Sequence, residues 1–301
     1  MKRATLAILV IAALVFSAWL HPAIWISIAA CVVPALIIAL IHGERINILS
    51  GRKLGMMTAT KGNSLALVGA FFIPGRVTEI LKPFYFLKTR QLPVSAGISI
   101  VMVERIFDVV ALVVLALVAV NFIDIASQSF YGAITNLAIF VSIVLMLVLL
   151  IAFRFPSAIE KLIKRLPPAS LRRFLESSFV SFRQGLAFGF SYWSIILTSV
   201  VWAGSVGLYW LFLKFDGGAQ LEFGQSLIVF LIGTLGITIT ITPGGIGTFE
   251  AAVALILQQF GYGFEAALAS AIGLRLVVFF PNAIIASYVV MFEGFSFVKA
   301  R

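Results

Sequence analysis

The sequence predicts an all-α polytopic membrane protein, and three observations support this fold class. Of the 301 residues, 61% are hydrophobic and 11% are charged. A soluble core cannot hide so much apolar surface from water, so the chain needs lipid as its solvent. The apolar residues also form long runs, and a segment near the first third of the chain returns, altered, near its end. These features predict about six full spans, two oppositely oriented re-entrant helical hairpins and an inverted internal repeat.

The predicted spans are apolar runs long enough to cross about 30 Å of hydrocarbon as helices. They cover residues 4–20, 22–41, 94–120, 131–153, 192–213 and 264–291. The first run resembles a signal peptide, but residues 17–22 contain no small-residue cleavage site, so we expect a retained helix. We predict a single integral membrane domain, 1–301, with repeat halves of about 1–121 and 131–292.

Two further apolar runs end at helix-breaking residues. The run 63–73 has about eleven residues, roughly 16 Å of helix, which is too short to span. The run 225–241 is longer, and a helix resumes at Thr248 and continues to about residue 260. The breaking residues are Pro74 and Gly75 in the first run and Pro243, Gly244 and Gly245 in the second. We interpret both as re-entrant hairpins with tips buried in protein, because free backbone groups at membrane depth need such cover. If each arm spans instead, the count becomes about ten and the parity is unchanged.

The distribution of basic residues predicts the orientation. The chain has 22 Lys and Arg against 12 Asp and Glu, and the basic residues lie mostly between apolar runs, which indicates topology rather than nucleic-acid binding. With the N-terminus inside, the inner segments collect Lys2, Arg3, Arg45, Arg52, Lys53, Lys61, seven basic residues in 154–183, Lys299 and Arg301. We therefore predict a multi-pass protein of the cell inner membrane with both termini in the cytoplasm. The first hairpin, with Lys82, then enters from the cytoplasm and the second from outside.

The longest inner segment, 154–191, is predicted to be a basic amphipathic loop in the cytoplasm. Apolar residues recur at helical spacing in 159–166 and again after Ser170, opposite Lys and Arg. Both helices are typical of segments that lie in the interface of an anionic leaflet. The alternative is a cytoplasmic helical hairpin without lipid contact. Either way, the loop is too short for a catalytic domain.

Six charged side chains are predicted to lie within the membrane, where each costs about 2.5 to 3.5 kcal/mol at a helix centre. They are Glu79, Glu104, Arg105, Asp108, Glu250 and Arg275. In one interpretation, Glu79 with Arg105 and Glu250 with Arg275 are buried ion pairs that pin each hairpin to a span. In the other, the arginines hold an anion, together with Arg76 at the first tip, for which the sequence shows no obvious partner.

The hairpin tips add a second source of positive potential, because a helix that begins after Pro-Gly exposes its first N–H groups. Glycines at the second tip allow a nest of N–H groups, although they also suit a tight turn or close helix packing. Packing is the favoured interpretation of Gly185 and Gly189. The predicted substrate-binding residues are Arg76, Glu79, Glu104, Arg105, Asp108, Gly244, Gly245, Gly247, Glu250 and Arg275. We expect no catalytic residue, metal or cofactor, since Cys31 is alone and His21 and His42 lie at predicted span ends.

At these residues the chain resembles the family named for the transmembrane region of lysylphosphatidylglycerol synthases, which are flippase-like integral membrane proteins. The matching motifs are I-P-G-R-V-T-E at 73–79, V-E-R-I-F-D at 103–108, T-P-G-G-I-G-T-F-E at 242–250 and G-L-R at 273–275. The resemblance covers nearly the whole chain and implies movement of polar or charged lipids, including lipid-linked sugars, between leaflets. Thr78 and Lys82 depart from the family pattern, which usually has Gly and Arg there. The soluble aminoacyl-transferring domain of longer members is absent, so lysyl transfer is not expected.

The leading hypothesis is therefore a lipid translocase in which a phosphate-bearing headgroup enters between the hairpins. The expected partners are a membrane lipid and the membrane itself, with no nucleic acid, and a homodimer is left open. A membrane enzyme of lipid or lipid-linked glycan biosynthesis is the first alternative, although the sequence places no nucleophile beside a base. A non-transporting membrane subunit is the second. Chemical turnover of a lipid would favour the enzyme, and leaflet movement without chemical change the translocase.

Overall fold

The structure is a computed structural model that describes residues 22–72, 75–90, 92–122, 163–164, 168–238, 242 and 245–294. Within these residues the regular elements are helices: α2 (Pro22–Leu49), α3 (Met56–Ala70), η1 (Gly75–Ile80), α4 (Leu81–Arg90), α5 (Val94–Ala119), η2 (Val120–Phe122), α8 (Ala169–Gly189), α9 (Tyr192–Phe215), α10 (Phe223–Thr238), α11 (Thr248–Gln259) and α12 (Phe264–Phe292). The predicted all-α class is confirmed.

Three of the described helices are long and apolar enough to cross a membrane by length and composition, namely α2, α9 and α12. Helix α5 has 26 residues, a comparable length, but carries charged side chains near its middle. The outer surface also exposes large apolar side chains, among them Ile26, Trp193, Leu255 and Ile284, each more than half exposed. Apolar surface of this kind suits lipid rather than water. The polytopic membrane class is thus supported, while the predicted spans 4–20 and 131–153 lie outside the described residues.

Helix α2 is longer than predicted, since it passes through Pro34 and ends at Leu49 instead of residue 41. Its last turns pack closely on α3, where a Cβ added at Gly43 would lie 1.8 Å from Oγ1 of Thr60. The extension places Arg45 inside the helix with no exposed surface. The placement of Arg45 in an inner loop is therefore wrong, while the predicted orientation of the chain stays a prediction.

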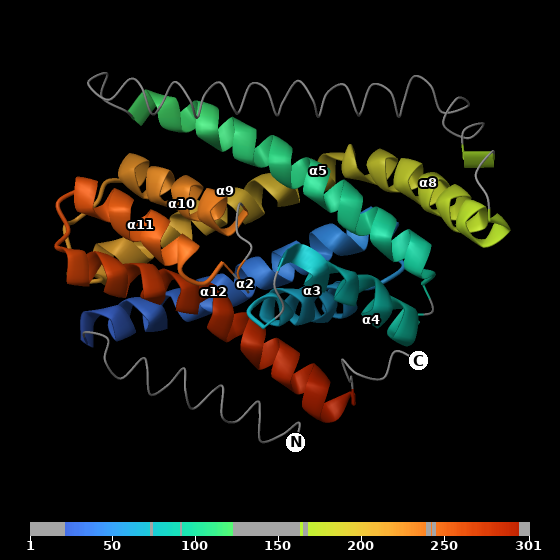
Figure 1. Ribbon diagram of the computed structural model, residues 1–301, viewed down its shortest axis with the longest axis horizontal. Coiled ribbons are helices and arrows are strands. Elements are labelled where there is room, and N and C mark those ends of the chain that lie inside the picture. The colour runs from blue at the N-terminus through green and yellow to red at the C-terminus, as the bar shows by residue number, and fades with distance from the viewer. Residues whose placement is uncertain are drawn as a thin grey trace.

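Two helix–break–helix units correspond to the predicted hairpins. We call α3, η1 and α4 the first hairpin, and α10 and α11 the second hairpin. They lie in opposite halves of the molecule, the first beside the end of α2 and the start of α5, the second beside the end of α9 and the start of α12 (Figure 1). In the first hairpin α4 packs on α5 and α3 on α12; in the second, α11 packs on α12 and α10 on α5. This exchange of partners is compatible with an inverted repeat, which stays a prediction, as does re-entry into the membrane.

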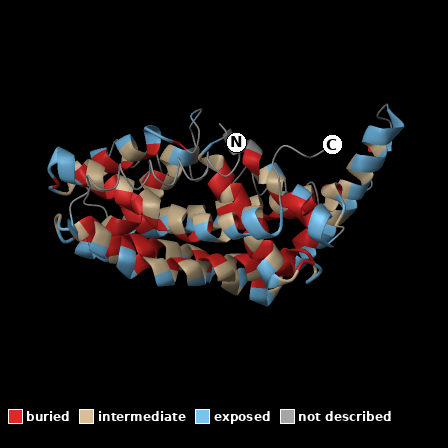
Figure 2. Ribbon diagram, turned by 90° about the horizontal axis from the view of Figure 1, so that it is seen from below, coloured by how far each residue is buried: buried red, intermediate tan, exposed pale blue. Residues whose placement is uncertain are grey.

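The core lies between these units, and Figure 2 shows buried residues in the interior with exposed ones on the outside. One apolar cluster joins α2, α9, α10, α11 and α12, and a second joins α2, α3, α4, α5 and the ends of α8 and α12. Each hairpin therefore packs with its long neighbour as one apolar unit. Charged groups can persist inside such units only when they are paired.

Helix α8 begins at Ala169, within two residues of the start that the sequence predicts after Ser170. Its N-terminal part projects from the helical body (Figure 2). Leu171 and Phe174 on this part are exposed. The last turn instead packs on α5, where a Cβ added at Gly185 would lie 3.2 Å from Val103 and one at Gly189 only 2.3 Å from the ring of Phe107. The packing interpretation of these two glycines is confirmed, and contact of α8 with lipid stays a prediction.

Replacing Gly189 by Ala is expected to destabilise the protein by about 1 to 3 kcal/mol, because the added methyl group overpacks the contact with Phe107. Gly207 is the matched control, since a Cβ there would meet nothing within 4 Å. Thermal unfolding in detergent should show a lower midpoint for Gly189→Ala and an unchanged or slightly higher one for Gly207→Ala. Equal midpoints for the two variants would contradict the close contact.

Asp216 closes the turn after α9 with a buried carboxylate. It accepts hydrogen bonds from Oγ of Ser270 at 2.6 Å, from the hydroxyl of Tyr262 at 3.1 Å and from the backbone N–H of Gly218 at 3.0 Å. Burial raises the pKa of this carboxyl above its usual value. The carboxyl group of Asp216 therefore joins the end of α9 to the start of α12. It takes up a proton more readily in the folded than in the unfolded chain.

A carboxyl whose pKa is raised by folding holds more protons in the folded than in the unfolded state between the two pKa values. Stability should therefore fall as the pH rises from about 4, the unfolded value, through the folded pKa. Asp216→Asn is expected to remove this decline, whereas Glu222→Gln, at an exposed residue of the same loop, should retain it. Unfolding midpoints measured from pH 4 to 7 test this, and an identical pH dependence in all three proteins would refute it.

Candidate functional site

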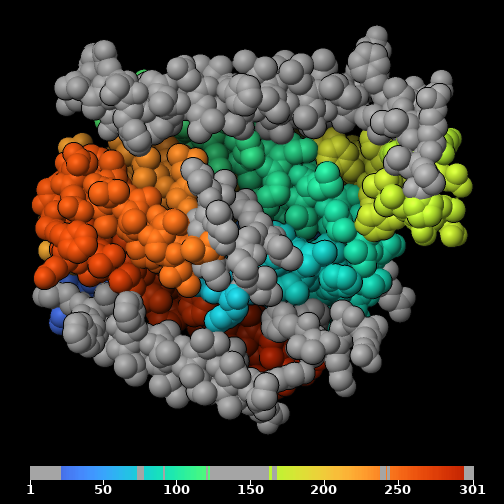
Figure 3. Space-filling view, viewed as in Figure 1, coloured from blue at the N-terminus to red at the C-terminus, as the bar shows by residue number. Residues whose placement is uncertain are grey.

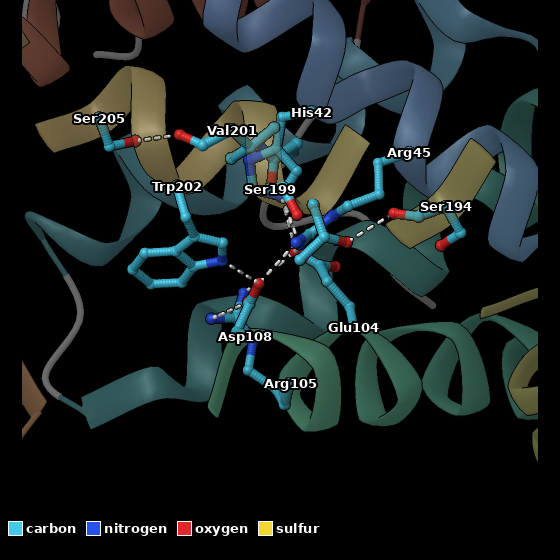
Figure 4. A network of polar contacts seen from close by, with 12 residues as sticks. His42, Arg45, Glu104, Arg105, Asp108, Ser194, Ser199, Val201, Trp202 and Ser205 are labelled. Carbon is cyan, nitrogen blue, oxygen red and sulfur yellow. Dashed lines mark hydrogen bonds and ion pairs between the residues drawn. The ribbon is translucent and has the colours of Figure 1, made fainter. Parts of the chain in front are cut away.

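The middle of α5 carries three charged side chains within two turns, Glu104, Arg105 and Asp108. Glu104 has no exposed surface and Asp108 is buried, whereas the side chain of Arg105 is 34% exposed. Figure 4 shows these residues facing α2 and α9, which supply the groups that surround them. The spacing of three and four residues places all of them on one side of the helix, as predicted.

Glu104 is the centre of this site, because four basic groups contact one carboxylate. Nε2 of His42 lies 2.9 Å from Oε1 of Glu104, and Nζ of Lys82 lies 3.1 Å from both oxygens. Nη2 of Arg105 follows at 3.3 Å and Nη2 of Arg45 at 3.4 Å. A fully buried carboxylate in such surroundings is held in its ionised form by direct charge pairing.

Asp108 lies one turn further along α5 and is the second carboxylate that pairs with Arg45. Nη1 of Arg45 donates to Oδ1 of Asp108 at 2.7 Å, and Nη1 of Arg105 lies 3.3 Å from Oδ2. The indole Nε1 of Trp202 on α9 also donates to Oδ1, at 3.2 Å (Figure 4). Three helices, α2, α5 and α9, are thus joined at one carboxylate.

Glu79 in η1 connects the first hairpin to α5. Its Oε1 accepts from Nη2 of Arg105 at 2.9 Å, and its Oε2 lies 2.9 Å from Nζ of Lys82. The ion pair between Glu79 and Arg105 that the sequence suggested is therefore present. Together, the charges described here are those of Arg45, Lys82 and Arg105 against Glu79, Glu104 and Asp108. We call this set, with His42, the α5 charge cluster; with His42 neutral, its formal charges cancel.

The second hairpin contains the other suggested pair, in which Arg275 of α12 is bonded to Glu250. Nη2 of Arg275 donates to Oε2 of Glu250 at 3.0 Å and to the carbonyl oxygen of Gly245 at 2.9 Å. Gly245 and Gly247 have φ values of 71° and 89°, so this turn needs the left-handed conformation that glycine adopts without strain. The pair fastens the turn between α10 and α11 to the middle of α12.

The sequence predicts that the backbone N–H groups at the second tip are open to an anion. The N–H of Gly247 is instead occupied, because it donates to Oε2 of Glu250 at 2.8 Å. The same oxygen accepts from Arg275. The carboxylate of Glu250 therefore occupies the position at which a guanidinium and a helix N-terminus both favour negative charge. An external anion would have to displace this carboxylate or share its donors.

The two hairpins meet at Arg275. Its Cζ lies 4.6 Å from the ring centroid of Phe249 in the second hairpin and 5.6 Å from that of Phe71, the residue that follows α3 in the first. The ring of Phe71 also contacts Phe279 of α12, with centroids 4.6 Å apart. In Figure 3 the first hairpin, in cyan, and the second, in orange, lie on one face of the molecule on the two sides of its centre. A cation clasped between two aromatic rings from opposite hairpins ties both to one helix.

The first hairpin is also tied to the far end of α12. Oε1 of Glu293 lies 2.5 Å from Nζ of Lys61 on α3, and Oε2 accepts from the hydroxyl of Tyr85 on α4 at 2.6 Å. Nζ of Lys88 donates to the carbonyl oxygen of Gly294 at 3.2 Å. These contacts join α3 and α4 to the C-terminal end of α12.

The structure thus groups the predicted site residues into two places. Glu79, Glu104, Arg105 and Asp108 lie in the α5 charge cluster, and Gly245, Gly247, Glu250 and Arg275 lie at the second tip. Gly244 and the side chain of Arg76 lie outside the described part of the chain. Binding of a substrate by any of these residues remains a prediction.

Sequence reasoning missed three members of the α5 charge cluster, His42, Arg45 and Lys82. His42 and Arg45 are three residues apart and therefore share a face of α2 if the helix continues, which was the available signal. Lys82 follows Glu79 by the same spacing in the first hairpin. His42 was interpreted as a residue at a span end and Arg45 as a residue of an inner segment, where basic side chains serve orientation. Lys82 was assigned to the first hairpin but not to the site.

An all-helical membrane protein with a network of ion pairs buried between its first hairpin and helices α2, α5 and α9 is the class that fold and site define. The chain matches the family model of the lysylphosphatidylglycerol synthase TM region over residues 4–286, so it belongs to this family. A curated relative, the UPF0104 membrane protein MJ1078 of Methanocaldococcus jannaschii, is 25% identical over 215 residues, which cover 69% of this chain and 86% of the relative. No solved structure matches the chain. The predicted family membership is confirmed.

Proposed function

We propose that this protein is a translocase that moves polar lipids with a phosphate-bearing, anionic headgroup between the leaflets of the membrane. The convergence of both hairpins on Arg275 carries this proposal, because a cation that contacts a ring from each hairpin inside an apolar helical body could hold an anionic headgroup there. Membership of a family named for the membrane region of a lipid-modifying synthase supports a role with lipids.

Two arginines supply the contacts for the headgroup. The side chain of Arg105 is one-third exposed, and its buried Nε has no hydrogen-bond partner among the described residues, so a rearrangement of this side chain would offer a donor to an additional acceptor. In this structure Arg275 donates to Oε2 of Glu250, and this carboxylate oxygen occupies the position that we assign to a phosphate oxygen of the headgroup. A phosphate accepts bidentate hydrogen bonds from guanidinium more strongly than a neutral group does. In the proposed cycle the headgroup replaces Glu250 on Arg275, and release of Glu250 loosens the second hairpin.

Leaflet movement tests this function. The purified protein is reconstituted in vesicles that carry a fluorescent phosphatidylglycerol, and the inner-leaflet fraction protected from an impermeant reductant is followed with time. We expect transfer of this lipid and none in protein-free vesicles, with the lipid unchanged in mass. A fluorescent phosphatidylcholine measures the dependence on headgroup charge. Modified lipid would favour an enzyme, and neither transfer nor modification would favour a non-transporting subunit.

The proposed orientation, with both termini in the cytoplasm, has a separate test. Asp216 is a poor labelling position because it is buried, whereas Gln220 in the same loop and Lys164 in the predicted inner loop are exposed. With Cys31 replaced, a cysteine at position 220 should react with an impermeant maleimide in intact cells, and one at 164 only after lysis. Labelling of position 164 alone in intact cells would reverse the orientation.

A further inference from the structure

His42 occupies a position in the α5 charge cluster that ion pairing alone does not require. Its Nε2 lies 2.9 Å from Oε1 of Glu104 and 3.1 Å from Nη2 of Arg45, and its Nδ1 lies 3.5 Å from Nδ2 of Asn63. The side chain of His42 is 19% exposed, against 0% for Glu104 and 1% for Arg45. Among these three groups, water reaches the imidazole most readily.

The contacts of Nε2 cannot all be satisfied in one protonation state. A nitrogen that donates to Glu104 cannot also accept from Arg45, so the neutral ring satisfies one neighbour at a time. The doubly protonated ring donates to Glu104 through Nε2 and needs an acceptor at Nδ1. Asn63 can supply it, because rotation of its amide exchanges the NH₂ group for the oxygen. The surroundings of His42 can therefore hold the ring with or without the second proton.

We propose that His42 is a proton-binding site, and that its proton is taken up together with the anionic headgroup. This inference rests on the proposed function, since it assigns the group that couples headgroup binding to pH. Imidazole is the side chain whose ordinary titration falls between about pH 5 and 8, which suits a proton exchanged under physiological conditions. Imidazole and carboxylate groups inside membrane proteins recur in proton pathways.

Charge balance is the first argument for joint binding. The described charges of the cluster cancel when His42 is neutral, so an anion that binds alone leaves one unpaired negative charge in an apolar body. A proton on His42 adds one positive charge, and a singly charged phosphodiester restores neutrality. Each ligand therefore lowers the electrostatic cost of the other, and this coupling must be reciprocal.

The geometry supplies the route for the coupling. A charged His42 competes with the other cations for Glu104, and Arg105 is the one that water can solvate, since it is 34% exposed against 1% for Lys82 and Arg45. Arg105 is therefore the cation that is released most easily to meet the headgroup. The charged groups that face His42 are Arg45 on α2, Lys82 on α4, and Glu104 and Asp108 on α5. Helix α3 contributes the uncharged Asn63.

The proton site itself is tested by NMR on protein labelled with ¹⁵N-histidine. The chain has two histidines, so His21→Gln leaves a single labelled ring and assigns the signal of His42. We expect the ring nitrogens of His42 to change protonation state between about pH 5 and 8. A ring that keeps one state over this range would overturn the proposal, whatever the protein does with lipid.

The coupling is tested by the affinity of the detergent-solubilised protein for dioctanoyl phosphatidylglycerol, whose single negative charge is constant over this range. From pH 8 to pH 5.5 the affinity should rise about 5- to 150-fold, the usual range of coupling between two sites. His21→Gln should retain this rise. His42→Gln, which keeps a donor to Glu104 but takes up no proton, should bind with the same affinity at both pH values. An equal rise in His42→Gln would overturn the proposal.

Two further ligands separate the sources of the anion. Dioctanoyl phosphatidylcholine carries the phosphate with a compensating cation, and inorganic phosphate carries no lipid chain. We expect weaker binding of both. Equal binding of inorganic phosphate would assign the coupled site to a free anion and contradict a headgroup site. If phosphatidylglycerol binds at no pH, the proposed function and the coupling both fail, while the NMR titration still decides whether His42 is a proton site.

Discussion

Replacing Glu104 by Gln is expected to prevent stable folding, with a loss of about 3 to 5 kcal/mol in the free energy of unfolding. The carboxylate is fully buried and contacts Lys82, Arg45 and Arg105, of which the first two are also buried. Gln keeps the shape but removes the negative charge, so cations remain without their shared partner. This cost exceeds that of an ordinary lost hydrogen bond, which is about 0.5 to 1.5 kcal/mol.

Thermal unfolding in detergent and the yield of monodisperse protein measure this effect. Glu265→Gln is the matched control, because Glu265 is exposed in the first turn of α12 and its charge is worth about 1 kcal/mol at most. Adding Lys82→Met to Glu104→Gln removes one charge of each sign and should recover part of the loss. A single Glu104→Gln variant as stable as the control would show that the cluster is not held by charge.

The second large effect concerns the pair at the second hairpin, Glu250 and Arg275. Either single change, Glu250→Gln or Arg275→Gln, leaves one largely buried charge without its ion-pair partner and should destabilise the protein by about 3 kcal/mol. The double variant removes both charges and should recover much of that loss. If Arg275 also binds a phosphate, the folded double variant should bind the anionic lipid about ten- to hundredfold more weakly, since a charged hydrogen bond contributes about 1.5 to 3 kcal/mol.

Unfolding midpoints and lipid affinities of the four proteins form a double-mutant cycle that separates these roles. We expect near-normal stability together with weakened lipid binding in the double variant. Normal binding and transfer by that variant would make Arg275 a structural residue and place the headgroup site elsewhere. If the double variant does not recover stability, the contacts of the Arg275 guanidinium with Gly245, Phe71 and Phe249 stabilise the fold independently of its pairing with Glu250.

Much of the fold follows from apolar run length, because hydrocarbon thickness sets the length of a spanning helix. The runs at 192–213 and 264–291 therefore match α9 and α12 closely, and the restart at Thr248 is the observed start of α11. The end of α2 was misplaced for a physical reason. Hydropathy falls at His42, but a helix can continue into polar sequence when its side chains find partners on other helices, as Arg45 does with Asp108.

The candidate site could be predicted where a single helix carries the signal. Glu104, Arg105 and Asp108 share one face of α5, and each arginine pairs with the carboxylate suggested for it. Contacts between distant segments could not be predicted, because one sequence carries no information about which helix faces meet. The approach of Phe71 to Arg275 is such a contact.

Helix α12 connects two of these features over a considerable distance. Arg275 near its middle holds the second hairpin, and Glu293 at its end holds the first. At 1.5 Å per residue the two positions are roughly 27 Å apart along the axis. Pro281 lies between them, and proline inside a helix is a frequent point of bending. Helix α12 therefore holds one contact of each hairpin, so a displacement of this helix at Arg275 would also act on the contacts of Glu293.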